Sequence, residues 1–192
     1  MADQTFTAGQ ILTASQMSAL QSNIGLVPIT PTSVTNATLT GNVAAITSGQ
    51  STITLSGVFT SSFESYKVII TGMRTSGTQT VYMKLNNSTG STYNYIITYF
   101  SYSSSVSVNA NSSADANGMA IAFGATTTTS SETEIFSPFA ATATTFRGSN
   151  QGPANPTTMV GIDTNAASSA NLILTVTSGS FSAGNIRVYG YR

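Results

Sequence analysis

From Ser51 to its last residue the chain repeats one pattern, in which short runs of β-branched and aromatic residues are separated by clusters of Gly, Asn and Ser. Within a run, apolar and hydroxyl side chains alternate with a period of two, as Ile53 and Leu55 do between threonines. This period is typical of strands that bury one face. It predicts strands at 53–55, 66–71, 80–85, 93–100, 106–109, 119–123, 133–136, 157–162, 172–177 and 186–191.

These runs are short, are bounded by turn signals at regular intervals and are not interleaved with helical patterns. Such spacing is typical of antiparallel sandwiches and barrels. We therefore expect an all-β fold, in which residues 51–192 form an antiparallel, jelly-roll-like β-sandwich.

The helical signal lies near the start of the chain. Met17, Leu20 and Ile24 recur with helical spacing and follow a capping box that begins at Thr13. A helix of about three turns is marginal in water on its own, so we expect it to dock on another surface. We expect residues 1–25 to form this anchor, with its contacts made by Phe6, Ile11, Leu12, Met17, Leu20 and Ile24.

Residues 26–50 join the expected anchor to the β domain. They contain Pro28 and Pro31 and are otherwise rich in Thr, Asn, Gly and small apolar residues. This composition predicts an extended linker. The linker could be a flexible tether or an arm that lies in a groove of a neighbouring subunit.

Composition excludes several classes of function. Six Lys and Arg balance six Asp and Glu, and charged residues make up only 6% of the chain. A nucleic-acid binder needs clustered cations to neutralise phosphates, so we expect no nucleic-acid partner. The chain has no Cys and no His, which excludes zinc sites and Ser-His-Asp hydrolysis. We expect no catalytic residues, cofactor or metal.

The same scarcity of charge bears on association. The mean hydropathy is +0.12 and 40% of residues are hydrophobic, so little charge keeps copies of the chain apart. We expect an obligate oligomer that buries part of this apolar surface between chains. Apolar runs such as 68–70 are far too short to cross a bilayer, and the first four residues lack a basic signal region, so neither membrane insertion nor secretion is expected.

Four carboxylates are candidates for chemistry. Glu132 and Glu134 lie two apart on a predicted strand, so they should point to the same face, as paired carboxylates of a glycosidase could. The alternative is an acidic edge strand that discourages aggregation. The sequence identifies no third group for such a site. Asp115 or Asp163 could bind Ca²⁺ in a turn, although neither lies in a recognisable calcium loop.

An aromatic cluster follows residue 92. Tyr93, Tyr95 and Tyr99 share one strand parity, whereas Phe100 and Tyr102 share the other, so one set should be exposed or at an interface. The three tyrosines could stack on a glycan, or they could serve core and intersubunit packing. Among the cations, Arg147, Arg187 and Arg192 are single charges near apolar strands, and a carboxylate partner is expected for Arg187.

The N-terminus carries a specific resemblance. The opening FTAGQILTA at 6–14 resembles the Phe-Thr-Ala-Gly-x-x-Leu-Thr-Ala opening of tail-fibre and other appendage proteins of tailed bacteriophages. Where that pattern often has Asn, this chain has Ser18. The runs ITLSG at 53–57 and YKVII at 66–70, and the ending NIRVYGYR at 185–192, are similar in style to phage structural modules.

The resemblance implies a virion structural protein rather than an enzyme. It implies a homotrimer, assembled in the host cytoplasm, whose leading segment anchors to other virion proteins while the β domain projects and can contact a host receptor or surface glycan. A tail-associated fibre or short spike is the first reading, and a capsid decoration or head-fibre protein is the alternative. A depolymerase using Glu132, Glu134 or Asp163 and a monomeric lectin are the rivals from other classes.

Overall fold

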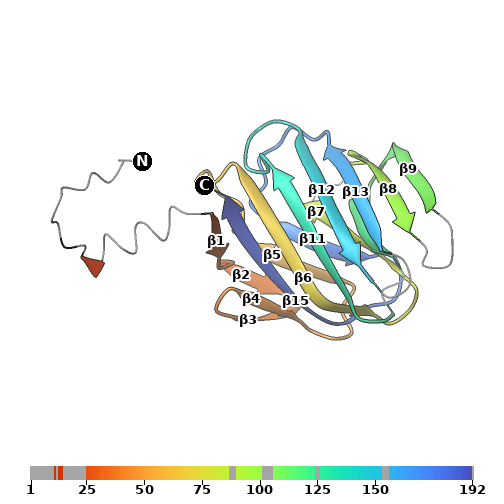
Figure 1. Ribbon diagram of the computed structural model, residues 1–192, viewed down its shortest axis with the longest axis horizontal. Helices are drawn as coiled ribbons and strands as arrows, with labels where there is room; N and C mark the ends of the chain where they lie inside the picture. Colours follow the sequence, from red (N-terminus) through yellow and green to blue (C-terminus); the bar gives the residue numbers. More distant parts are fainter. Residues whose placement is uncertain are drawn as a thin grey trace.

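The computed structural model describes residues 11, 13, 14, 25–86, 90–100, 106–123, 126–152 and 156–191. Within these ranges the chain forms fifteen strands in two antiparallel sheets (Figure 1). The large sheet has the order β3 (Ala37–Thr40), β4 (Val43–Ile46), β15 (Phe181–Tyr191), β6 (Ser65–Thr75), β11 (Thr129–Phe136), β12 (Thr144–Gln151), β13 (Thr157–Asp163), β8 (Tyr93–Phe100) and β9 (Val106–Asp115), and β1 (Leu26–Ile29) also pairs with β15. The small sheet has the order β10 (Met119–Phe123), β7 (Thr80–Leu85), β14 (Leu172–Val176), β5 (Thr52–Ser56) and β2 (Ser33–Thr35). The predicted all-β, antiparallel class is confirmed.

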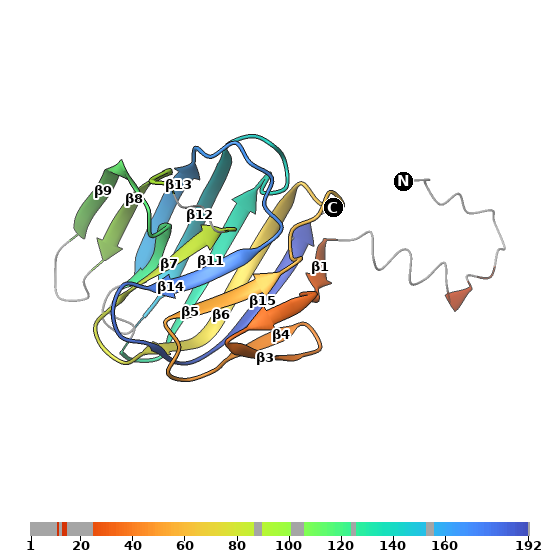
Figure 2. The same ribbon diagram turned by 180° about the vertical axis from the view of Figure 1, so that it is seen from behind.

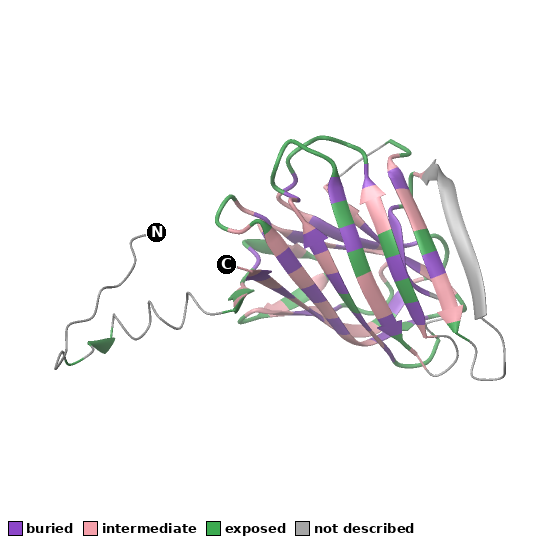
Figure 3. Ribbon diagram, turned by 45° about the horizontal axis from the view of Figure 1, so that its top comes forward, coloured by how far each residue is buried: buried purple, intermediate pink, exposed green. Residues whose placement is uncertain are grey.

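The two sheets lie face to face, with the large sheet in front in Figure 1 and the small sheet in front in Figure 2. Each inner face is mainly apolar because the strands alternate. On β6, Tyr66, Val68 and Ile70 are buried, whereas the residues between them are only partly covered. Figure 3 shows this alternation as bands along the strands of the large sheet. A period-two sequence therefore defines an inner and an outer face for each sheet.

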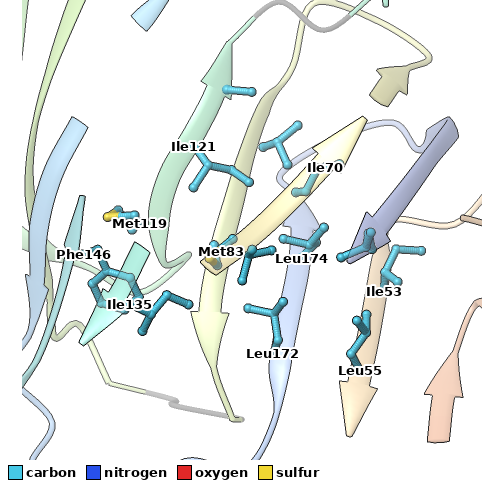
Figure 4. Close-up of a cluster of buried hydrophobic side chains, with 14 of the residues drawn as sticks. Ile53, Leu55, Ile70, Met83, Met119, Ile121, Ile135, Phe146, Leu172 and Leu174 are labelled. Carbon is cyan, nitrogen blue, oxygen red and sulfur yellow. The ribbon is translucent and has the colours of Figure 1, made fainter. Parts of the chain in front are cut away.

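The core fills the space between the sheets. Figure 4 shows Leu172 and Leu174 from the small sheet beside Ile70 and Ile135 from the large one. All four are at most 1% exposed. Burying an aliphatic side chain of this size stabilises a fold by about 1.5–3 kcal/mol, so this shared core holds the two sheets together.

The prediction that residues 26–50 form a linker is wrong, because they supply four strands. β1 pairs with the last strand, placing Val27 opposite Gly190. β3 and β4 form a hairpin at one edge of the large sheet, and β2 extends the small sheet beside β5. The partners of β1, β2 and β4 lie farther along the chain, so the local composition did not reveal the pairing.

The expected N-terminal helix lies outside the described residues. So do the expected anchor residues Phe6, Leu12, Met17, Leu20 and Ile24. Ile11 is described, and its side chain is 89% exposed.

Candidate functional site

A shallow hollow of about 410 Å³ lies on the outer face of the large sheet, away from the small sheet. We call it the outer-face groove. Its lining comes from three neighbouring strands and includes Gly148 on β12 and Met159 on β13. The outward-facing side chains that line it are Glu132 and Glu134 on β11, Arg147 and Ser149 on β12, and Thr158 and Val160 on β13.

Strand alternation places both glutamates on this face. Ser131, Thr133 and Ile135 point into the core from β11, so Glu132 and Glu134 between them point outward. The prediction that the two carboxylates share a face is confirmed. The alternative of an acidic edge strand is wrong, because β11 lies inside the sheet between β6 and β12.

Two ion pairs hold the carboxylates. Lys67 on β6 donates to Glu132 Oε2 at 2.8 Å, and Arg147 Nε donates to Glu134 Oε2 across the β11–β12 pair. The Tyr191 hydroxyl donates to the other oxygen of Glu134 at 2.9 Å. The sequence singled out Arg147 as a charge near an apolar strand, and the structure shows that its partner is Glu134.

These contacts shift the pKa values of three side chains. The hydrogen bond from Arg147 lowers the pKa of Glu134, because it favours the charged carboxylate. The hydrogen bond to Glu132 raises the pKa of Lys67, because it favours the charged ammonium. Burial, followed by the neighbouring Glu134, raises the pKa of Tyr191. Glu134 is therefore ionised at neutral pH and is poorly suited to act as a general acid.

The third candidate acid lies elsewhere. Asp163 is 2% exposed and belongs to the inner face of β13, and its Oδ1 accepts a hydrogen bond from the Asn165 backbone at 3.0 Å. The structure does not bring it together with Glu132 and Glu134. Asp115 is also engaged, since it accepts hydrogen bonds from the Tyr95 hydroxyl at 2.9 Å and the Asn117 backbone at 2.8 Å. Within the described ranges, no group of three or more acidic side chains is placed to hold a metal ion.

The tyrosines predicted as glycan contacts point inward. Tyr93 is 0% exposed, and its hydroxyl accepts a hydrogen bond from the Leu85 backbone at 2.8 Å, so the prediction of glycan contact is wrong for this residue. Burial strongly raises the pKa of the Tyr93 hydroxyl. Tyr95 and Tyr99 pack partly buried against the same core, in agreement with the alternative of core packing. The opposite parity is the exposed one, because Phe100 is 40% exposed.

Sequence reasoning missed one of the three strands of the groove, because it did not predict β12. The run TTFRGSNQ has one large apolar residue, Phe146, and no repeated alternation of apolar side chains. Its strand conformation comes from β11 and β13, which pair with it on both sides. The signal that could have found it is the spacing of Thr144 and Phe146, which are both buried.

The chain matches no model of a known protein family, no curated protein and no solved structure. Among the described residues, no helix has the length and apolar character needed to cross a membrane.

Proposed function

We propose that this chain is a structural protein of a tailed-bacteriophage particle, a trimeric tail-associated fibre or short spike. Residues 1–25 anchor it to other virion proteins, and the two-sheet domain projects outward. The observation that carries the proposal is the appendage-like opening FTAGQILTA at 6–14, which precedes an all-β domain that begins at Leu26. The first strand of that domain, β1, pairs with the final strand β15.

The strand order supports a jelly-roll assignment for the domain. In a jelly roll of eight strands, one sheet contains the first, eighth, third and sixth strands and the other contains the second, seventh, fourth and fifth. The order β5-β14-β7-β10 fits the first sheet, and β6, β11–β13, β8 and β9 fit the second. The seventh strand is then expanded into the β11-β12-β13 meander, and β15 is added beside β6. Such domains are common in viral capsids and lectins.

The surface of the domain supports association between copies. The formal charge of the whole chain is zero, and β8 exposes Ile96 (48%) and Phe100 (40%) on the outer face of the large sheet. Exposed aliphatic and aromatic groups that share a face are typical of contact surfaces. A non-enzymatic role agrees with the lowered pKa of Glu134, because this carboxylate is not set up to donate a proton.

The experiment that tests the proposal changes the anchor in the full-length chain. The double variant Met17→Asp/Leu20→Asp places charges on the expected docking face, and we expect it to be absent from purified particles while its β domain stays folded. Ser15→Asp/Ser22→Asp adds the same charges on the opposite face of that expected helix and should be incorporated normally. Equal incorporation of both double variants would overturn the assigned anchor.

A further inference from the structure

The outer-face groove extends beyond the hollow that defines it. A second hollow of about 230 Å³, lined by Ile69, Ser130 and Gln151, shares Glu132 and Ser149 with the first. Because the shared residues face each other on β11 and β12, the two hollows form one channel along the outer face of the sheet. The groove alone falls within the roughly 300–1,000 Å³ of small-molecule sites, and the added hollow lengthens it.

The polar groups of the groove are held in place before any ligand arrives. The Arg147 guanidinium contacts Glu134 through Nε and lies over the Phe136 ring at 5.4 Å from its centroid. Its side chain is nevertheless 65% exposed, and it lines the groove together with Ser149. Glu132 is fixed by Lys67 and keeps 55% of its side chain exposed. Fixed donors and acceptors bind at a lower entropic cost than mobile ones.

Charge balance selects the class of ligand. The two carboxylates are matched by Lys67 and Arg147, so the groove has no net formal charge. Glu132 would repel an anionic ligand, and Arg147 would repel a cationic ligand. The hydroxyl groups of a neutral ligand can instead donate hydrogen bonds to the carboxylate and accept them from the guanidinium.

The walls complete the match to a sugar. Ser149 and Thr158 add hydroxyl groups, and Val160, which is 56% exposed, offers an apolar surface to the C–H face of a ring. We propose that the outer-face groove binds a neutral oligosaccharide, with Arg147 as donor and Glu132 as acceptor. The inference deepens the proposed function and rests on it for the source of the glycan, a host surface.

Titration of the isolated full-length chain tests the site. The probes are neutral tetrasaccharides of glucose, galactose and mannose, with tetragalacturonic acid and tetraglucosamine as charged comparators, each followed by calorimetry and saturation-transfer NMR. We expect at least one neutral probe to bind with a dissociation constant of about 1 mM or below and to be preferred over both comparators. No neutral binding up to about 10 mM, or preference for a charged comparator, would overturn the proposal.

Matched variants place the binding. Ser149→Phe fills the groove, and Arg147→Ala removes its donor, so each should weaken binding on the order of tenfold or more. Thr145→Phe puts the same ring on the same strand and face but outside the groove, and it should leave binding unchanged. Melting curves confirm that each variant is folded, and Arg147→Ala, which adds no bulk, serves if Ser149→Phe does not fold.

Two results would contradict this placement. Binding that survives both groove variants would show that the sugar lies elsewhere. A lower native mass of Ser149→Phe than of Thr145→Phe would make the groove a contact between copies of the chain. The titration does not require a particle, so its failure leaves the proposed virion role standing, whereas failed incorporation of anchor variants concerns that role alone.

Discussion

Glu134 and Arg147 lie directly opposite each other on β11 and β12, and the arginine Nε donates to the glutamate Oε2 across the strand pair. The pair lies within the large sheet, not at its edge. The chain has only six Asp and Glu and six Lys and Arg residues. Four of these twelve form one cluster, which consists of Glu134, Arg147, Lys67 and Glu132. The outer face of β6, β11 and β12 is therefore the charged centre of an otherwise nearly uncharged domain.

Removing this ion pair should change the acid stability of the fold. The folded-state pKa of Glu134 lies below its ordinary value of 4.5, so its stabilisation is complete above that value and is lost as the pH falls through the lowered pKa. Glu134→Gln should therefore lower the free energy of unfolding by about 0.5–1 kcal/mol at pH 7, and the difference should shrink as the pH falls below about 4.5. Urea unfolding at several pH values measures it.

Arg147→Met is the partner control for that series, because it removes the main cause of the lowered pKa of Glu134. Below pH 4.5, its free energy of unfolding should depend on pH as that of Glu134→Gln does. The double variant should show little further change in the free energy of unfolding. If the unfolding free energy of Arg147→Met depended on acid pH as that of the unmodified chain does, the coupling between Arg147 and Glu134 would be contradicted.

Truncating one valine in the core and one in the groove should destabilise the fold to different extents. Val188 is 0% exposed on the inner face of β15, whereas Val160 is 56% exposed on the outer face of β13. Val188→Ala should cost about 2 kcal/mol through lost burial and the cavity that remains, and Val160→Ala about 0.5 kcal/mol or less. Chemical denaturation measures both, and equal costs would show that the sheets do not pack as described.

Two buried threonines should respond to Val in opposite directions. Thr133 is 1% exposed, and its hydroxyl has no hydrogen-bond partner among the described residues, so Thr133→Val should stabilise the fold by about 1 kcal/mol. The Thr75 hydroxyl, 4% exposed, donates to the Gly77 carbonyl at 2.7 Å, so Thr75→Val should destabilise it by about 1 kcal/mol. Differential scanning calorimetry gives both signs, and a destabilised Thr133→Val would imply an undetected partner.

Much of the β domain could be predicted from local patterns, because alternation is strong where a strand buries large residues. The expected run at 80–85 coincides with β7, and the expected common face of Glu132 and Glu134 is observed. β1 escaped prediction because its partner β15 lies far along the chain, whereas β12 escaped because its own sequence shows little apolar alternation. The groove was missed because β12 was not predicted, since Arg147 meets Glu134 only when β12 pairs with β11. The inward direction of Tyr93 follows from strand parity, but parity alone does not say which face is covered.

Alanine substitutions at two glycines with positive φ distinguish the cost of backbone strain from the cost of a steric clash. Gly41 has φ of 59°, and a Cβ added there would have nothing within 4 Å, so Gly41→Ala should cost about 1–2 kcal/mol through backbone strain alone. Gly118 has φ of 113°, and a Cβ there would lie 2.5 Å from the Met83 carbonyl oxygen. Gly118→Ala should therefore cost clearly more than Gly41→Ala in thermal unfolding, and a smaller cost would contradict the close approach of the β9–β10 turn to β7.

The native mass tests the expected self-association. A chain with few charges and with Ile96 and Phe100 exposed gains from burying these two side chains, and the cost of desolvating charge is small because charge is scarce. Sedimentation equilibrium should give three times the chain mass of 19.8 kDa at micromolar concentration. Ile96→Glu/Phe100→Glu should shift the chain toward the monomer, with Thr145→Glu as the control on the same face. A single-chain mass for the unmodified protein would rule out the trimer.

The most direct test of the proposed role is the position of the chain on purified phage particles, determined by mass spectrometry and electron cryomicroscopy. The proposal predicts threefold density at the tail, with residues 1–25 against a neighbouring virion protein and the two-sheet domain projecting from it. Regular density over the head would transfer the role to capsid decoration, and absence of the chain from purified particles would contradict the virion assignment itself.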